Sequence, residues 1–149
     1  MIMLVTAAIF MVSCGDNLKK ESTPTPAPTT YLPRVLFKDS DGFTGGSRAA
    51  IGACAQVTLC LENGYDSSAI IGASDVQAII STTACLIGAN SAITFYSDSG
   101  CVNSTNSIVV KAGKSTANFY YKLAGKACHY LGASADKFNK PSLFQVNNL

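Results

Sequence analysis

The chain has 149 residues, enough for one domain and some additional segments. Only 13% of the residues are charged and 48% are apolar, which excludes wholesale disorder. The formal net charge of +2 is too small to predict a nucleic-acid partner. Six cysteines in so short a chain are typical of exported proteins, which fold in an oxidising compartment.

The N-terminus has the features of an export signal. Residues 1–12 are apolar except for Thr6, and they lead into Ser13 and Cys14. This run has the length of a signal-peptide apolar region and is shorter than the roughly 20 residues of a membrane-spanning helix. Residues 11–14 (MVSC) resemble the lipobox of bacterial lipoproteins. They depart from it in having Met where Leu is usual, and no Lys or Arg follows Met1 closely.

The lipobox resemblance implies that residues 1–13 are a cleaved signal peptide. It further implies that Cys14 is acylated on its sulfur and on its new amino group. Several acyl chains anchor a protein firmly, whereas one chain binds a membrane only marginally. Gly15 follows the cysteine instead of Asp, which by resemblance to Gram-negative lipoproteins favours the outer membrane over the inner one. The alternative is a buried N-terminal strand with a free Cys14 thiol.

Residues 14–33 form a predicted linker. Their middle, residues 22–30, reads STPTPAPTT. Prolines at alternate positions forbid a helix and remove strand donors, so the segment favours extended polyproline II. At about 3.1 Å per residue, such a linker could hold the next domain up to roughly 55 Å from the lipid. A tether is favoured here over a proline-rich ligand for a partner domain.

Residues 34–149 have a β pattern. Short runs rich in Val, Ile, Thr, Phe and Tyr are separated by clusters of Gly, Asn, Asp and Ser, and no longer window has a helical period. The alternation in 56–62 places Val57, Leu59 and Leu61 on one face. This pattern predicts an all-β antiparallel sandwich, with a flexible loop over Gly42–Gly46. About eight strands are expected, at 35–37, 56–62, 76–80, 92–96, 107–111, 116–121, 127–133 and 143–146.

Four segments of this domain resemble bacterial Ig-like domains of exported proteins. They are residues 95–101 (FYSDSGC), 107–113 (SIVVKAG), 115–122 (STANFYYK) and 131–134 (LGAS). The resemblance covers about residues 53–146. It implies a single Greek-key sandwich with a stalk, adhesive or carbohydrate-facing role, and it brings no catalytic residue. Such domains often form tandem arrays, whereas this chain has room for one.

The Ig-like strand order implies two disulfides. Strands B to F are assigned to residues 56–62, 76–81, 107–111, 116–122 and 127–133. Neighbouring strands C and F then bring Cys85 to Cys128, and strands B and D, on either side of E, bring Cys54 to Cys101. Cys60 is left as a free thiol on the face of strand B opposite the apolar residues. The rival, a Cys60–Cys128 bridge across the sandwich, would need both sulfurs to point inward.

No catalytic residue, metal site or cofactor is predicted. His129 is the only histidine, and the sequence has neither a G-x-S-x-G nor a C-x-x-C motif. Residues 112–116 (AGKST) lack the first Gly of a phosphate-binding loop, so a hairpin turn is expected there. Asp39 and Asp41 are predicted to lie in a solvated turn, because Ala50 stands where an EF-hand needs Glu.

Lysines and tyrosines interleave toward the C-terminus. Lys114, Tyr120, Lys122 and Lys126 form a candidate binding rim suited to a sugar, an anionic polymer or a protein surface. Alternatively, the lysines only protect strand edges from pairing with other chains.

The sequence as a whole predicts a non-catalytic binding, adhesive or structural module. A lipid anchor would attach it to the membrane of the cell envelope, with an envelope protein or a polysaccharide as the expected partner. The alternative function is a small exported hydrolase or a hydrolase inhibitor. The two hypotheses differ in whether a flat sandwich surface or a deep polar cleft surrounds His129.

Overall fold

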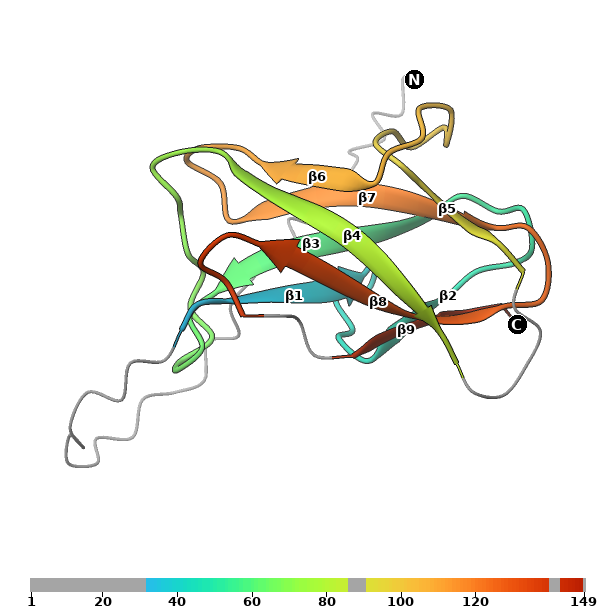
Figure 1. Ribbon diagram of the computed structural model, residues 1–149, viewed down its shortest axis with the longest axis horizontal. Coiled ribbons are helices and arrows are strands. Elements are labelled where there is room, and N and C mark those ends of the chain that lie inside the picture. The colour runs from blue at the N-terminus through green and yellow to red at the C-terminus, as the bar shows by residue number, and fades with distance from the viewer. Residues whose placement is uncertain (1–31, 86–90, 140–142, 149) are drawn as a thin grey trace, which may run out of the picture.

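The computed structural model describes residues 32–85, 91–139 and 143–148, which form two β-sheets packed face to face (Figure 1). The described ranges contain nine strands and no helix. Accordingly, no helix in these ranges has the length and apolarity needed to cross a membrane. The strands are β1 (Arg34–Asp39), β2 (Gly46–Arg48), β3 (Ala55–Glu62), β4 (Val76–Ala84), β5 (Ile93–Tyr96), β6 (Ser107–Val110), β7 (Thr116–Leu123), β8 (Cys128–Ala135) and β9 (Phe144–Asn147).

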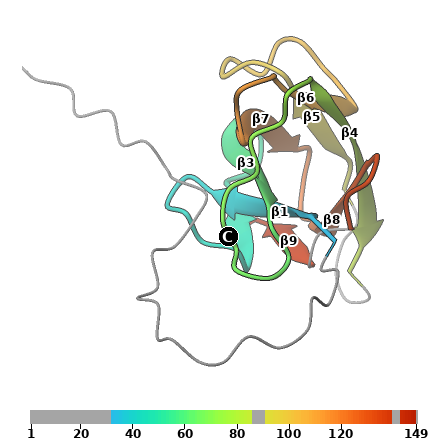
Figure 2. The ribbon, with the colours of Figure 1, turned by 90° about the vertical axis from the view of Figure 1, so that its left-hand side faces the viewer.

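The strand order is that of an Ig-like sandwich. One sheet has the order β1-β3-β7-β5, and the other has the order β2-β9-β8-β4-β6. The first corresponds to strands A, B, E and D of an Ig domain, and the second contains G, F and C with an additional strand at each edge. Figure 2 shows the two layers turned by 90°, with β3 and β7 in one and β4 and β8 in the other. The predicted all-β Ig-like sandwich is therefore confirmed.

The prediction of about eight strands missed β2. It follows the expected Gly42–Gly46 loop and pairs in parallel with β9. Ser47, in the middle of β2, is buried, and its hydroxyl accepts a hydrogen bond of 3.0 Å from the hydroxyl of Tyr121. β2 has only three residues, and its one buried side chain is a serine. The sequence therefore has no apolar alternation there that would indicate a strand.

The predicted strand D is also wrong. Residues 107–111 were expected beside strand E, but β6 pairs with β4 in the opposite sheet. The place next to β7 is taken by β5 instead. Ile108 and Val110 point into the core, where both are nearly inaccessible to solvent. Alternation along a strand indicates which residues share a face. It does not indicate from which of the two sheets they point, because both sheets face the same core.

The core lies between the sheets and is centred on Phe119. The Phe119 ring centroid lies 5.8 Å from that of Phe37 and 6.0 Å from that of Phe95, in edge-to-face arrangements. Phe37 in turn contacts Phe144 of the opposite sheet at 5.7 Å. The predicted inward residues of β3 are fully buried. Aromatic packing across the middle of the sandwich therefore joins both sheets.

Part of the outward face of β1 and β3 is buried as well. Five side chains on these strands point away from the core, yet each is less than 9% exposed: Leu36, Lys38, Thr58, Cys60 and Glu62. The Glu62 carboxylate lies 3.2 Å from the guanidinium of Arg34 and 3.8 Å from the ammonium of Lys38. This face therefore holds an ion-pair network beside a small apolar cluster of Leu36 and Cys60.

The predicted free thiol at Cys60 is wrong. Alternation correctly placed Cys60 on the outer face, but the residue is disulfide-bonded, and no free cysteine occurs among the described residues. The other four cysteines of the described ranges are paired with one another. The sixth cysteine of the sequence, Cys14, lies outside the described residues.

We predict that Phe119→Ala lowers the free energy of unfolding by about 3–5 kcal/mol, because it leaves a cavity at the centre of the core. Urea unfolding under oxidising conditions would measure the change. Tyr120→Ala, at the next position on the outward face, is the matched control and should cost much less. Equal losses for the two variants would contradict the assignment of the two faces of β7.

Candidate binding surface

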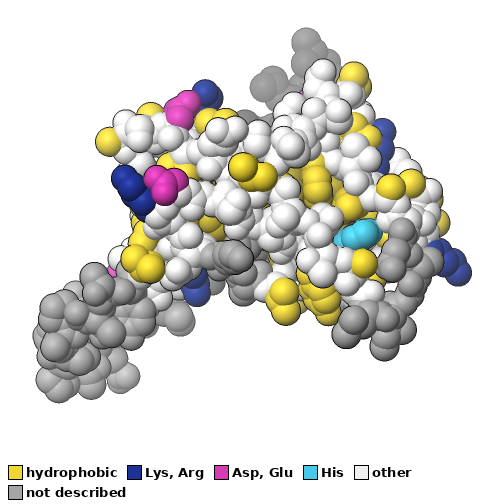
Figure 3. Space-filling model, in the orientation of Figure 1, with side chains coloured by type: hydrophobic (Ala, Val, Ile, Leu, Met, Phe, Trp, Pro, Cys, Tyr) yellow, Lys and Arg dark blue, Asp and Glu magenta, His cyan; other side chains and the backbone are white. Residues whose placement is uncertain are grey.

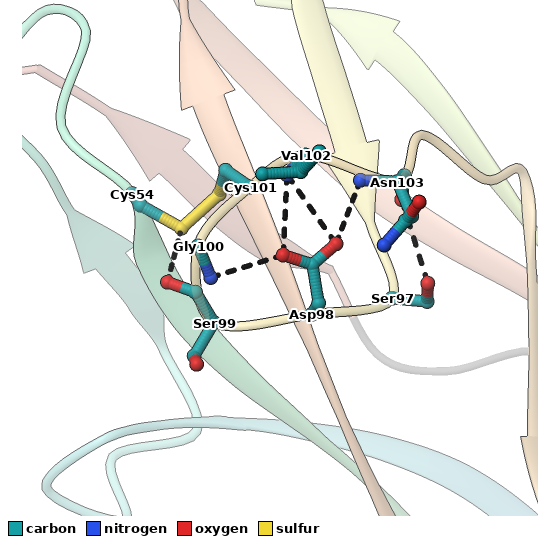
Figure 4. The surroundings of a disulfide bond; sticks show 8 residues. All are labelled: Cys54, Ser97, Asp98, Ser99, Gly100, Cys101, Val102 and Asn103. Carbon is teal, nitrogen blue, oxygen red and sulfur yellow. Dashed lines mark hydrogen bonds between the residues drawn. A yellow bond between two sulfur atoms is a disulfide. The ribbon is translucent and has the colours of Figure 1, made fainter.

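Two disulfides fasten loops to strand ends. Cys54 and Cys101 join the start of β3 to the loop after β5, with a Cα–Cα distance of 5.9 Å (Figure 4). Cys85 and Cys128 join the end of β4 to the start of β8, with a Cα–Cα distance of 5.4 Å. These are the two pairs that the Ig-like order implied. The reason for the first pair differs from the prediction, however. Cys101 lies in the loop after β5, and the residues expected to form strand D form β6 in the opposite sheet.

Asp98 organises the loop that carries Cys101. Its carboxylate accepts hydrogen bonds from the backbone N–H groups of Gly100 (3.0 Å), Val102 (3.2 Å) and Asn103 (2.7 Å) (Figure 4). Cys101 itself has a φ of 51°, in the left-handed region. The loop is thus held by a carboxylate on its inside and by a disulfide on its side. We call residues 97–103 the Asp98 loop.

The hydrogen bonds to Asp98 favour its charged form. The bond from the backbone of Asn103 contributes most, and together the bonds hold the pKa of the Asp98 carboxyl below its usual value of 3.8. A carboxyl whose pKa is lower in the folded state stabilises that state above the unfolded pKa. The contribution is lost as the pH falls through the folded pKa. The Asp98 loop should therefore loosen in acid and not in base.

We predict that protection of the Gly100, Val102 and Asn103 amides against hydrogen exchange is lost only as the pH falls below 3.8 and through the lowered pKa of the Asp98 carboxyl, because protonation then removes the charge that accepts their hydrogen bonds. Asp98→Asn should reduce this protection already at neutral pH and remove the acid step. Asp136→Asn, in a turn after β8, is the control and should leave both unchanged. The measurement is amide exchange by NMR, corrected for intrinsic rates. Protection that is independent of pH in the unaltered chain would contradict the role of Asp98.

Two tyrosines and a lysine share the outward face of β5 and β7. Tyr96 on β5 and Tyr120 on β7 are direct cross-strand partners. The ammonium of Lys122 lies 5.6 Å from the centre of the Tyr96 ring, in a cation–π contact. All three side chains are partly exposed. We call Tyr96, Tyr120 and Lys122 the tyrosine–lysine surface.

The structure brings together only two of the four predicted rim residues. Tyr120 and Lys122 lie on one face of β7, two positions apart. Lys114 lies in the turn before β7, and Lys126 lies in the loop after it, so these two lysines are at opposite ends of the strand. Tyr96 was missing from the predicted rim. Its outward orientation follows from the alternation of β5, but its place beside Tyr120 follows only from the strand pairing.

The surroundings of His129 are those of a structural residue. Its side chain is buried, and Nε2 lies 2.9 Å from the carbonyl oxygen of Ser91. Because a carbonyl only accepts, Nε2 carries a proton. A polar pocket of about 440 Å³ opens beside the β1–β2 loop and Gln145, and His129 is not part of its lining. This arrangement does not match the deep polar cleft that the hydrolase hypothesis requires.

The predicted turn at Asp39 and Asp41 is present. The Asp39 carboxylate accepts hydrogen bonds from the backbone N–H groups of Asp41 (2.9 Å) and Phe43 (2.8 Å). Both bonds end on Oδ1 of Asp39 and shape the turn. Within residues 32–85, 91–139 and 143–148, no group of three or more His, Cys, Asp or Glu side chains could hold a metal ion.

Comparison with protein-family models finds no match for the chain, and neither does comparison with curated proteins. Among solved structures, a conjugative transposon lipoprotein from Bacteroides eggerthii is 10% identical; the alignment covers 80% of this chain and 100% of that chain, with a TM-score of 0.47. The CARDB domain of the PF1109 protein from Pyrococcus furiosus is 10% identical, with coverages of 81% and 97% and a TM-score of 0.44. Domains 4 and 5 of the S-layer protein SbsC are 12% identical, with coverages of 78% and 53% and a TM-score of 0.39. Because these scores are below 0.5, the function proposed next does not rest on them.

Proposed function

We propose that the chain is a lipid-anchored module of a bacterial cell envelope with a non-catalytic binding or structural role. The order of its segments carries this proposal. A lipobox-like sequence ends at Cys14, a proline-rich stretch follows, and the sandwich begins at Arg34 with β1. The two disulfides support an oxidising location. Transport to the outer membrane, suggested by Gly15, is the finer form of the proposal.

The tether would enter at one end of the sandwich. Arg34, the first residue of β1, is paired with Glu62 and forms a bridge to Asn139. We call this the anchor end. The opposite end, which we call the far end, contains the start of β8 at Cys128 and the end of β4 at Ala84. Loops at the far end would therefore be displayed away from the membrane.

Acylation and a disulfide cannot share one sulfur atom. Cys60 is disulfide-bonded. A disulfide between Cys60 and Cys14 in the mature protein would leave the Cys14 sulfur unable to carry an acyl chain. The proposal requires the Cys14 sulfur to carry lipid. Peptide mapping of the mature protein without reduction separates the two chemistries.

We predict that Cys14→Ser moves the protein from the detergent phase to the aqueous phase in a cloud-point partition, because the acyl chains are lost. Intact mass measurement should find the unaltered protein beginning at Cys14 with added lipid. Cys60→Ser is the matched control and should still partition into detergent. Unchanged partitioning of Cys14→Ser, or a peptide linking Cys14 to Cys60 in the mature protein, would contradict the anchor.

We assign the proposed binding role to the tyrosine–lysine surface. Tyrosine offers a large apolar ring with a polar tip, and an adjacent ammonium adds a charge, which suits an envelope protein or a polysaccharide. The side chains are preorganised, since Tyr96 and Tyr120 are cross-strand partners and Lys122 contacts the Tyr96 ring. The alternative hydrolase function has no such support, because His129 is buried against Ser91.

We predict that Tyr120→Ala lowers retention of the mature protein on isolated envelope material at least about tenfold, because it removes half of the aromatic pair. Chemical crosslinking followed by mass spectrometry would identify what is lost. Asn118→Ala, exposed two positions earlier on the same face of β7, is the control. Equal retention of the two variants would move the binding role away from this surface.

A further inference from the structure

The second half of β4 has an open edge. On one side, β8 pairs with β4 from Ala78 to Ala84. On the other side, β6 pairs with β4 only from Val76 to Ile79. The N–H of Ile80 still donates to the carbonyl of Asn106, and beyond it no described strand lies along this side of β4. Figure 1 shows the end of β4 extending past β6 toward the far end.

The main-chain groups at this edge can be assigned by parity. The N–H of Cys85 donates to the carbonyl of Cys128, so odd-numbered residues of β4 point their main-chain groups at β8. Even-numbered residues, including Ile80, point toward the β6 side. The N–H and C=O groups of Thr82 and Ala84 therefore face the open edge.

This edge lacks the usual protection against strand addition. Residues 81–84 are all exposed, and residues 80–84 (ISTTA) contain no charge and no proline. Thr and Ile favour strands, so the segment suits an extended conformation. The outward residues of β4 and β8 around it are uncharged too, and Figure 3 shows this face with charged side chains only toward its margins.

The other sheet edges are shorter or covered. At β1, the N–H groups of Val35 and Asp39 donate to the carbonyls of Asn139 and Phe43. At β5, the carbonyl of Phe95 accepts from the N–H of Thr105. The edge strands β2 and β6 have only three and four residues, and on β6 the N–H and the carbonyl of Ser107 are both bonded to the Thr105 hydroxyl. Within the described part of the chain, the far half of β4 is therefore the edge best suited to accept another strand.

We propose that a second copy of this chain adds to this edge, with β4 antiparallel to β4 of the other copy about a two-fold axis at Thr83. In this register, Thr82 of each copy lies opposite Ala84 of the other copy. Each such pair exchanges two main-chain hydrogen bonds, because both residues present N–H and C=O to the open side. The pairing ends before Ile79, so it does not compete with β6.

A second copy is favoured because the edge is complementary to itself. An antiparallel pair about a two-fold axis presents the same segment from both sides, as in most homodimers. No charge in 80–84 opposes a like charge in the other copy. Four main-chain bonds and a few small side chains form an interface well below the roughly 1,200 Å² of stable complexes, so pairing should be weak in dilute solution.

The direction of β4 determines the shape of the pair. β4 runs from the anchor end to the far end, and the open edge is its last part. Antiparallel pairing there joins two far ends and leaves the two anchor ends at opposite extremes. This consequence for the tethers, unlike the pairing itself, rests on the proposed lipid anchor. It suits copies carried on facing surfaces, where confinement raises the local concentration.

Analytical ultracentrifugation of the mature chain, from about 10 μM to about 1 mM, tests the pairing over the range of a weak dimer. Cys14 and Cys60 are both replaced by Ser, so that neither lipid nor an intermolecular disulfide can cause association. We expect a monomer–dimer equilibrium and an elongated dimer by small-angle X-ray scattering. A chain that remains monomeric throughout this range would overturn the proposal.

Two variants locate the interface. Thr82→Pro removes an edge N–H but no bond to β8, and Ala84→Lys adds a charge beside the two-fold axis; each should weaken association at least about tenfold. Asn118→Lys, on a central strand of the other sheet, is the control for added charge. Circular dichroism and disulfide mapping establish that each variant is folded. A dimer that survives both edge variants would place the interface elsewhere.

Amide exchange identifies the occupant of the edge. In dilute samples, the Thr82 and Ala84 amides should exchange quickly, and protection should appear as the dimer forms. Protection already present in the monomer would mean that the chain covers its own edge, which overturns the proposal. Binding of an uncharged strand-forming peptide at these amides in a chain that does not dimerise would replace the second copy by another partner.

Discussion

The two faces of β7 are the constraint on which both the core and the candidate surface depend. Inward, Phe119 and Tyr121 fill the space between the sheets; outward, Tyr120 and Lys122 are partly exposed. Because the side-chain period of a strand is two residues, a slip of one position would exchange the two sets. The bond from the Tyr121 hydroxyl to Ser47 fixes the register further, since it ties β7 to β2 of the opposite sheet. The tyrosine–lysine surface is therefore positioned by the packing behind it.

Which face of a strand is buried could be predicted from the sequence, but which strand lies beside it could not. Alternation correctly oriented β3, because successive side chains of a strand point to opposite faces. The place of β6 depends on a chain crossing that leaves no local pattern, and β6 was assigned to the wrong sheet for that reason. The two disulfide pairs were nevertheless predicted correctly. Cys101 reaches Cys54 through the loop after β5 and not through a strand D. Likewise, the burial of Cys60 depends on tertiary packing and not on its strand.

The same crossing links the tyrosine–lysine surface to the open edge. In the variable-type Ig order, the chain passes from strand C to neighbours in the same sheet before it crosses to strand D, whereas in the constant-type order it crosses from C to D directly. Here it crosses first to β5 and returns through the Asp98 loop to β6. On its return the chain enters β6 at Ser107, opposite Ile79, and the preceding Asn106 accepts a hydrogen bond from Ile80. The far half of β4 therefore stays uncovered. This path of the chain, across to β5 and back to β6, therefore places Tyr96 beside Tyr120 and also leaves β6 shorter than β4.

The strand directions place the anchor end and the far end at opposite ends of the sandwich. One small domain can therefore carry a tether at one end and pair with a second copy at the other. Arg34 of β1 and Asn139 after β8 meet at the anchor end, whereas Ala84 of β4 is paired with His129 near the start of β8. A strand of nine residues rises about 3.3 Å per residue, so its two ends are roughly 30 Å apart. A second copy at the far end would thus not contact a tether at the anchor end. Because the tyrosine–lysine surface belongs to the other sheet, it would stay open while two copies pair through β4.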